Sequence, residues 1–393
     1  MIRPLDGILV VSFEQAIAAP FASRQLAEAG ARVIKVERPG DGDFARVYDQ
    51  RTRGICSHFV WVNRSKESLT LDIKHPAASE ILDRLLAKAD VVMQNLAPGA
   101  AARCGLGAKA LRAKYPRIIT CGISGYGEDG PYRDKKAYDL LVQSEAGLLA
   151  ITGSVDEPAK AGIPVADIAA GTNAYSSILN AIILRGRTGV GSGIDVSMLE
   201  ALTEWMGFPL YYTIDGQSAP PRAGASHATI YPYGPFSAGD NKVVVFAIQN
   251  EREWGWFCNE VITQPSLVED ARFKGSAARS LHRQALKQII EGAFKPLSAK
   301  EVIDRLNAAK IANGRMNQLS ELWAHPQLAA RKHWAAVNSP VGNIPNLMPV
   351  GKTDGYAPRL DPIPAVGQHT RGILGELGFS DQTIMQMQSQ GVI

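Results

Sequence analysis

The chain has 393 residues, more than a typical single domain, so two domains or one domain with a large excursion are expected. Its 46% hydrophobic and 20% charged residues are typical of a globular protein with an ample core. The net charge is +4, and the basic residues are scattered, which argues against a nucleic-acid partner.

The cysteines and histidines show no pattern of a metal or disulfide site. Four cysteines form no C-x-x-C pair, and the seven histidines have no metal-ligand spacing. The start of the chain lacks the pattern of a signal peptide, and no apolar stretch reaches membrane-spanning length. We therefore expect no metal, no membrane partner and a cytoplasmic location.

The first part of the chain alternates strand-like and helix-like segments. The expected strands are residues 7–13, 32–37, 90–94 and 118–121, and the expected helices are residues 20–29, 76–88 and 108–114. This β-α-β alternation predicts an α/β fold with a Rossmann-like parallel sheet.

The later segments predict a second, smaller domain. Helices over 166–185 and 197–214, separated by a strand at 193–196, complete a large domain at 1–214. Gly, Pro, Ser and Ala are frequent in 215–235, which we interpret as a linker. A small α+β domain is expected over 236–330, with a strand at 242–247 and helices at 251–262, 279–294 and 298–309. Residues 331–393 are expected to return to the large domain, ending in helices at 370–377 and 381–388.

The turn after the first strand excludes a dinucleotide site. Residues 14–20 read EQAIAAP and contain no glycine, whereas a pyrophosphate needs glycines to approach the backbone there. No G-x-x-x-x-G-K loop and no G-x-S-x-G elbow are present. Nicotinamide, ATP and α/β-hydrolase chemistry are therefore not expected.

Asp167 lies in a segment of small residues, IPVADIAAG, at the expected start of a helix. Pro164 ends an extended stretch, so Asp167 falls in the first turn, where free N–H groups favour an ionised carboxylate. An Asp in that position either caps the helix or serves as a nucleophile to which a bulky acyl group has access. The residues alone leave these two interpretations open.

Polar and basic residues follow three successive strands of the predicted sheet. Arg38 follows the second strand, Asn95 and Arg103 the third, and Lys136 the fourth. Because ligands of open α/β sheets bind beyond the carboxyl ends of the strands, these side chains can converge. A ligand with several phosphates, such as coenzyme A, would need this convergence of cations.

Eight segments follow one another along nearly the whole chain: RVIKVERPG (32–40), NRSKESLTLDIK (63–74), NLAPG (95–99), SGYGEDGP (124–131), KAYD (136–139), IPVADIAAG (163–171), DVSMLEA (195–201) and PAVGQHTRGILGEL (364–377). Together they resemble the class III CoA-transferases, which include formyl-CoA transferase and carnitine CoA-transferase.

This resemblance implies roles for individual residues. Asp167 would be the catalytic nucleophile, and Gln15 would lie beside the reacting carbonyl. The implied CoA contacts are Arg38, Leu71, Asn95, Arg103, Lys136 and Tyr138. Coenzyme A would enter only as part of the substrate, with no tightly bound cofactor. The resemblance also implies an interlocked homodimer, in which each chain forms an open ring threaded by the other.

The implied reaction transfers CoA between carboxylates through an aspartyl anhydride and an aspartyl-CoA thioester. The segments at 12–21, 36–49 and 133–153 look most similar to the branch that moves CoA between the two carboxylates of mesaconyl-CoA. The alternatives are intermolecular transfer from succinyl-CoA to a dicarboxylate and, in another class, an α-methylacyl-CoA racemase. A racemase needs a His-Asp pair, but Tyr138 precedes Asp139 here.

A dicarboxylate substrate requires a cation for its second carboxylate. Four arginines are candidates for this cation, and the sequence alone does not distinguish among them: Arg46, Arg51, Arg53 and Arg222. The aromatic residues Tyr231, Tyr233 and Phe236 are expected to close the acyl pocket.

Overall fold

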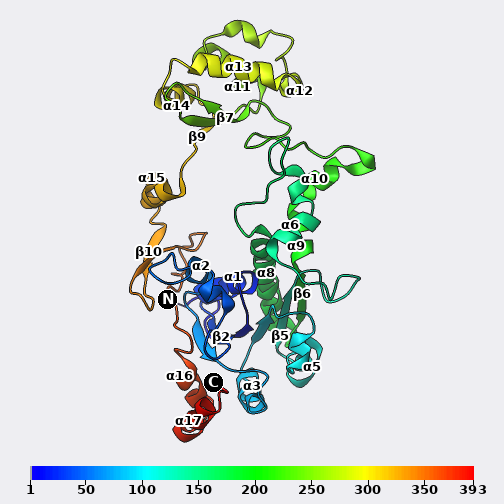
Figure 1. Ribbon diagram of the computed structural model, residues 1–393, viewed down its shortest axis with the longest axis vertical. Helices are drawn as coiled ribbons and strands as arrows, with labels where there is room; N and C mark the ends of the chain where they lie inside the picture. The colour runs from blue at the N-terminus through cyan, green and yellow to red at the C-terminus, as the bar shows by residue number, and fades with distance from the viewer. Residues whose placement is uncertain (1) are drawn as a thin grey trace. The chain divides into compact units, whose positions relative to one another are not determined.

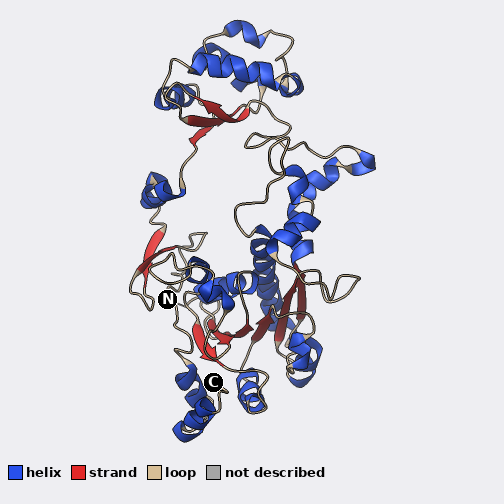
Figure 2. Cartoon of the chain, in the orientation of Figure 1, coloured by secondary structure: helices blue, strands red, loops and turns tan. Residues whose placement is uncertain are grey.

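The computed structural model describes residues 2–393 and divides into two compact units. The first unit comprises residues 2–146, 161–207 and 329–393, and the second comprises residues 147–160 and 208–328. Each unit combines helices and strands (Figures 1 and 2). No helix among the described residues is both long and apolar enough to cross a membrane.

The first unit is built on a six-stranded, fully parallel sheet, which confirms the predicted α/β fold. Its strands are β1 (Leu9–Phe13), β2 (Arg32–Glu37), β3 (Glu67–Thr70), β4 (Val91–Gln94), β5 (Ile119–Ser124) and β6 (Gly193–Ser197). Their order is β3-β2-β1-β4-β5-β6. From β1 the sheet is extended to one side by β2 and β3 and to the other side by β4, β5 and β6. The strand order therefore reverses between β1 and β4, and the carboxyl ends of these two strands mark the expected ligand crevice.

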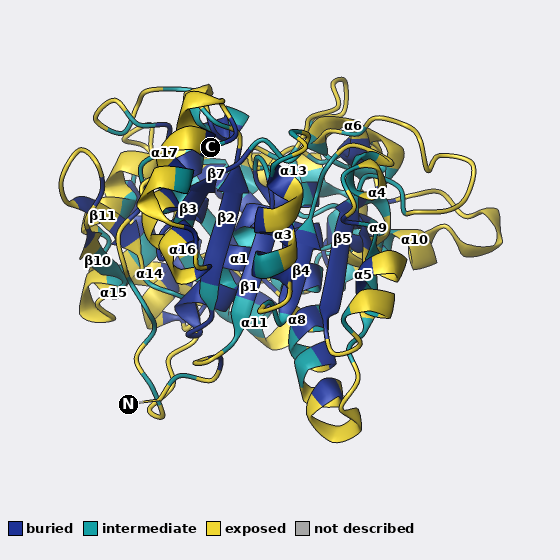
Figure 3. Cartoon of the chain, turned by 90° about the horizontal axis from the view of Figure 1, so that it is seen from below, coloured by how far each residue is buried: buried dark blue, intermediate teal, exposed yellow. Residues whose placement is uncertain are grey.

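Helices cover both faces of this sheet, whose strands are largely buried (Figure 3). On one face, the apolar side chains of α1 (Ala18–Glu28), α8 (Val165–Thr188) and α9 (Met198–Trp205) form one core. On the other face, α3 (Ala78–Leu86) shares a core with the C-terminal helices α16 (Thr370–Glu376) and α17 (Asp381–Ser389). Shorter helices in this unit are α2 (Ser57–Val62), α4 (Ala100–Arg103), α5 (Ala108–Lys114), α6 (Asp139–Glu145) and α15 (Pro326–Ala330), which straddles the boundary between the units.

Helices α1 and α8 approach each other closely at Gly171. A Cβ atom on Gly171 would lie 2.6 Å from the carbonyl oxygen of Ala18, so only glycine fits there. Gly171 lies one helical turn after Asp167, and Ala18 lies three residues after Gln15. The helix contact therefore brings the first turn of α8 next to the β1–α1 turn.

The second unit is a smaller α+β structure. Strands β7 (Tyr233–Ser237), β8 (Val243–Ala247) and β9 (Asn313–Arg315) form an antiparallel sheet. Its aromatic core includes Phe236, Phe246 and Trp254. The helices are α7 (Leu148–Ile151), α10 (Gly207–Tyr212), α11 (Glu251–Trp256), α12 (Ser276–Leu281), α13 (Arg283–Phe294) and α14 (Ala299–Ala308). A separate hairpin, β10 (Trp334–Val337) and β11 (Ile344–Leu347), belongs to the first unit.

Several local expectations differ from the structure, among them the following three. Strand β3 was not predicted, because its sequence, ESLT, contains a single apolar residue and gives no apolar run. The helix expected over 197–214 is divided into α9 and α10, where Gly207 and Pro209 weaken a continuous helix. Strand β7 begins at Tyr233, inside the segment interpreted as a linker.

Candidate functional site

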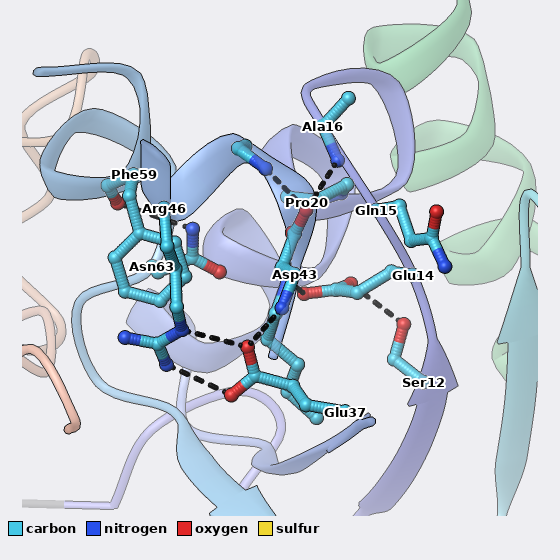
Figure 4. A network of polar contacts seen from close by, with 12 residues as sticks. Ser12, Glu14, Gln15, Ala16, Pro20, Glu37, Asp43, Arg46, Phe59 and Asn63 are labelled. Atoms are coloured by element: carbon cyan, nitrogen blue, oxygen red, sulfur yellow. Dashed lines mark hydrogen bonds and ion pairs between the residues drawn. The ribbon is translucent and has the colours of Figure 1, made fainter. Parts of the chain in front are cut away.

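The turn between β1 and α1 is fixed on both sides of Gln15. The Gln15 N–H donates to Asn95 Oδ1 at 2.8 Å, and Asn95 Nδ2 donates to the Gln15 carbonyl at 2.8 Å. Ala16 has a φ of 59°, a left-handed conformation that is unusual for alanine, and its N–H donates to Asp43 Oδ1 at 3.1 Å (Figure 4). Asn95, predicted as a CoA contact, thus uses its side-chain amide to hold Gln15.

Three of the predicted site residues line one small cavity at this edge of the sheet. Gln15, Arg38 and Leu71 surround about 40 Å³ beyond the carboxyl ends of β1, β2 and β3. Arg38 is exposed, and its guanidinium has no hydrogen-bond or ion-pair partner among residues 2–393. This cation is therefore available to a ligand.

Arg103 lines a larger cavity of about 710 Å³ with Lys74, His75 and Lys114. Ile73 lines both cavities, so the two adjoin. The Arg103 guanidinium folds over Gly99, where a Cβ atom would lie 2.8 Å from Nη1. Gly99 also has a φ of 70°, so both conformation and space favour glycine in the NLAPG segment.

Lys136 and Tyr138 lie on the loop before α6, and both are exposed. Gly125 fixes this loop, because a Cβ atom there would lie 2.1 Å from the Cβ of Ala137. The neighbouring Lys135 forms an ion pair with Glu145 and lies over the Tyr132 ring. Lys136 has no such partner among the described residues and stays available to an anion.

Asp167 lies in the first turn of α8 but does not cap it. Asp139 Oδ1 accepts the Ala166 N–H at 2.8 Å, and Asp139 Oδ2 accepts from Gln143 Nε2 at 2.6 Å. The Asp167 carboxylate has no hydrogen-bond or ion-pair partner within residues 2–393. Asp139 therefore caps the start of α8, and the Asp167 carboxylate has no such structural role among the described residues.

The surroundings of Asp167 make its carboxylate more basic than usual. Burial and then the negative charge of Asp139 raise the pKa of Asp167 from 3.8 to about 7. A carboxylate that is short of hydrogen bonds and poorly solvated is a stronger nucleophile than one in water. A pKa shifted this far by burial and a neighbouring charge is typical of functional sites.

Tyr48 is a neighbour of Asp167 that the sequence did not identify. Burial raises the pKa of the Tyr48 hydroxyl to about 12, and the charges of Asp43 and Asp167 and the hydroxyl of Tyr138 add to that increase. Its ring packs edge-on against His58 at 5.6 Å between centroids. Tyr48 lies in the quoted segment 36–49, but no local pattern distinguishes it from a surface tyrosine.

The structure separates the four candidate arginines. Arg46 donates to both carboxylate oxygens of Glu37 and to the Pro364 carbonyl. Arg53 and Arg222 donate to backbone carbonyls, and Arg222 belongs to the second unit. The Arg51 guanidinium is exposed and has no partner in the described chain.

The expectation that three aromatic residues close the acyl pocket is wrong for two of them. Tyr231 and Phe236 are 3% and 1% exposed and belong to the core of the second unit. Tyr233 stacks on His227. Alternating aromatics near a turn resemble a pocket wall, but here they form the inner face of β7 and its approach.

One cluster has the composition of a metal site. The ligand atoms of Asp49, Cys56 and His58 lie within 4.8 Å of one another. However, the Asp49 carboxylate accepts from the Ser57 hydroxyl at 2.6 Å and from the backbone N–H groups of Arg51 and Ser57. These hydrogen bonds fix the turn that leads into α2, which accounts for the cluster without a metal.

Comparison with known proteins identifies the same class of protein. The family model "CoA-transferase family III" matches residues 5–370. The succinyl-CoA:glutarate CoA-transferase of Homo sapiens is 31% identical, covering 100% of this chain and 90% of that protein. The succinyl-CoA:mesaconate CoA-transferase of Haloarcula hispanica is 29% identical over 96% of this chain and 98% of its own length. A CAIB/BAIF family protein from Brucella suis has a similar crystal structure, with a TM-score of 0.85 and 31% identity over 96% and 100% of the two chains.

Proposed function

Because the chain belongs to CoA-transferase family III, we propose that it transfers CoA between carboxylates of short dicarboxylic acids through covalent intermediates on Asp167. The observation that supports this proposal most strongly is the Asp167 carboxylate itself. It is poorly solvated, has no partner among residues 2–393, and lies at a helix start that Asp139 caps instead. These properties are required of a carboxylate nucleophile.

The transfer follows from carboxylate chemistry. Asp167 attacks the thioester carbonyl, and the C–S bond breaks to give a mixed anhydride and the CoA thiolate. The thiolate attacks the aspartyl carbonyl of the anhydride, which releases the acid as a carboxylate and leaves an aspartyl-CoA thioester. The acceptor carboxylate then attacks this thioester, and the CoA thiolate recaptures the acyl group from the second anhydride. In this proposal the side-chain amide of Gln15 donates to the carbonyl oxygen as charge develops on it.

The phosphates of CoA need cations, and three predicted residues meet that need. Arg38, Arg103 and Lys136 follow β2, β4 and β5 along the chain, and all three are exposed. Tyr138, which is exposed, offers aromatic surface for the adenine or the pantetheine arm, whereas Leu71 lines the small cavity but is only 1% exposed. A CoA moiety held at its distal end keeps the thiolate at high effective concentration during the steps above.

We expect Arg38→Ala to weaken the binding of CoA thioesters without affecting folding. Loss of a charged hydrogen bond to a phosphate should cost about 1.5–3 kcal/mol, or roughly 10- to 150-fold in Kd. The melting temperature of the unliganded protein should stay unchanged, since the Arg38 side chain has no partner to lose. Calorimetric titration with CoA checks the affinity. A lowered melting temperature with unchanged affinity in the folded protein would show instead that Arg38 is structural.

Dicarboxylates are the favoured substrates, with mesaconyl-CoA as the favoured case. The relatives quoted above act, by their names, on succinyl-CoA with glutarate or mesaconate. An acid with a second carboxylate needs a cation that is not already paired, and Arg51 meets that condition better than Arg46, Arg53 or Arg222. In the intramolecular reaction, the freed acid stays bound while its other carboxylate attacks the aspartyl-CoA thioester.

The intramolecular reaction predicts conversion of one mesaconyl-CoA isomer to the other without added acid. Isotope-labelled free mesaconate in the medium should not enter the product, because the acid never leaves the site. Mass spectrometry of the products at intervals measures both quantities, and Arg51→Gln should raise the KM for this substrate. Strict dependence on an added acid, or rapid uptake of the label, would assign the protein to intermolecular transfer from succinyl-CoA.

Racemase activity is the weaker alternative. Asp139 is hydrogen-bonded to α8 and to Gln143, and the residue before it, Tyr138, is a poor base at neutral pH. Exchange of the α proton of 2-methylacyl-CoA in deuterated water would favour it.

An interlocked homodimer in the cytoplasm completes the proposal. Large apolar side chains are exposed on α8 and α9, among them Ile183, Leu184 and Trp205, as expected of a surface that a second chain covers. The four cysteines are free thiols, which suits a reducing compartment. A sedimentation mass equal to that of one chain would contradict the dimer.

A further inference from the structure

A network of buried charged side chains lies directly behind the β1–α1 turn (Figure 4). It contains the carboxylates Glu14, Glu37 and Asp43 and the cations Lys35, Lys66 and Arg46. Glu14, Lys35, Asp43 and Lys66 have fully buried side chains. With every member ionised, the three negative and three positive charges balance. Burial lowers the pKa of Lys66 to about 7, so Lys66 is the cation that loses its proton most easily.

The hydrogen bonds of this network lead to the turn that carries Gln15. Lys35 Nζ donates to Asp43 Oδ2 at 2.7 Å, and Asp43 Oδ1 accepts from the N–H groups of Ala45 at 2.9 Å and Ala16 at 3.1 Å. Glu37 Oε1 accepts the N–H of Asp43 at 3.1 Å. Asp43 is therefore held by Lys35 and Glu37 and in turn holds Ala16.

Ala16 needs this support because its φ of 59° is strained for any residue with a Cβ atom. Such a conformation persists only where the surroundings enforce it. Asp43 provides the bond on one side of the turn, and Asn95 provides two on the other. Without Asp43, Ala16 would relax to negative φ and change the direction in which Gln15 points.

A purely structural role would not require charges. Well-packed apolar residues can replace a buried ion network with little loss of stability, so such a network is weak evidence for a stabilising role. Here the charged side chains fix the orientation of the turn that carries Gln15. The close approach of α1 and α8 at Gly171 brings Asp167 next to the same turn, and a small rotation of that turn would withdraw Gln15 from the reacting carbonyl.

We infer that Asp43 is a positioning residue for the transfer reaction. Its ion pair with Lys35 holds the Asp43 carboxylate in place, and this carboxylate enforces the left-handed turn at Ala16 that directs Gln15 toward the Asp167 site. The inference rests on the proposed function of Asp167 and Gln15, and it extends the active site to a fully buried side chain at the border of the small cavity that Gln15 and Arg38 line.

The test is a double-mutant cycle between Asp43 and Gln15. Asp43→Asn leaves one acceptor oxygen where Asp43 has two, so either Lys35 or the N–H groups of Ala16 and Ala45 lose their acceptor. We expect kcat to fall about 10- to 100-fold with KM for the acyl-CoA unchanged. In a Gln15→Ala background the same change should produce no further fall in kcat, because Asp43 acts through Gln15. Losses that multiply in the double variant, or a wild-type kcat in Asp43→Asn, would overturn the inference.

Two further variants separate positioning from folding. Asp43→Glu keeps the buried charge but moves its oxygens away from the Ala16 N–H, so kcat should fall even where the melting temperature is preserved. Ser68→Ala removes a 2.5 Å hydrogen bond to Glu37 of the same network, away from the turn, and should lower the melting temperature without changing kcat. A wild-type kcat in folded Asp43→Glu would also contradict the inference.

Hydroxylamine trapping distinguishes the two levels of the proposal. Wild-type protein incubated with acyl-CoA and hydroxylamine should yield a modified Asp167. If it does so while the Asp43 variants react at the wild-type rate, the positioning role alone fails. If no modified Asp167 forms in the wild type, the function proposed for Asp167 fails.

Discussion

Replacing Asp167 by asparagine is expected to lower kcat by at least about 10³-fold, because the amide cannot form the anhydride on which every later step depends. CoA binding should persist, since Arg38, Arg103 and Lys136 lie on other loops. The raised pKa of Asp167 means that the folded protein binds its proton more tightly than the unfolded chain, so ionisation of Asp167 above pH 7 costs stability. The asparagine variant should therefore be no less stable than wild type at pH 8, which urea unfolding checks.

The same carboxylate predicts the pH dependence of the wild-type enzyme. Only ionised Asp167 attacks, so kcat/KM should fall tenfold per pH unit below an apparent pKa near 7. Asp139→Asn is the matched control: its side-chain oxygen can still accept the Ala166 N–H, but the charge that helps to raise the Asp167 pKa is gone. The acid limb should then move to lower pH. Near-normal turnover in both Asp167→Asn and Asp167→Ala would exclude the covalent mechanism.

Local patterns were sufficient for five of the six strands of the parallel sheet and for the position of Asp167. Strands such as β1, β4 and β5 are short, mostly apolar segments that alternate with helices, and Pro164 marks the start of α8. The residue that caps α8 could not be predicted in the same way. Asp139, which accepts the Ala166 N–H, lies 27 residues away in sequence, and short-range rules assign capping to the residue before the helix.

Contacts between distant segments account for most of what sequence could not predict. Asn95 follows β4 and was expected to face a ligand, but it bonds Gln15, 80 residues earlier, because β1 and β4 are neighbours in the sheet. Tyr48 and Asp167 are distant in sequence and become neighbours only in the folded unit. The left-handed Ala16 was also unpredictable, because alanine gives no signal for positive φ.

Glu14→Gln is expected to cause the largest loss of stability in the first unit. Burial by itself would raise the pKa of Glu14, but the charges of Lys66 and Lys35 outweigh it and lower the pKa from 4.5 to about 2. Lys66 Nζ lies 2.6 Å and Lys35 Nζ 3.4 Å from Glu14 Oε1, and all three side chains are fully buried. The neutral amide leaves a surplus positive charge in the interior. Because burial lowers the pKa of Lys66 to about 7, Lys66 can release its proton and limit the loss, which should be about 1–3 kcal/mol of unfolding free energy in urea at pH 7.

We attribute the expected loss of stability in Glu14→Gln to the charge imbalance, not to the loss of a carboxylate as such. Adding Lys66→Met to Glu14→Gln removes the surplus charge at similar volume, so the double variant should regain much of the lost stability. As a control, Glu376→Gln breaks an exposed ion pair with Arg32 and should cost no more than about 1 kcal/mol.

The stability difference between wild type and Glu14→Gln should also depend on pH. Because the folded-state pKa of Glu14 is lowered, the contribution of Glu14 to the unfolding free energy is complete above about pH 4.5 and is lost as the pH falls toward 2. The difference should therefore shrink over that interval. A difference that stays constant from pH 7 to pH 3, or a double variant less stable than Glu14→Gln, would show that packing and not charge determines the effect.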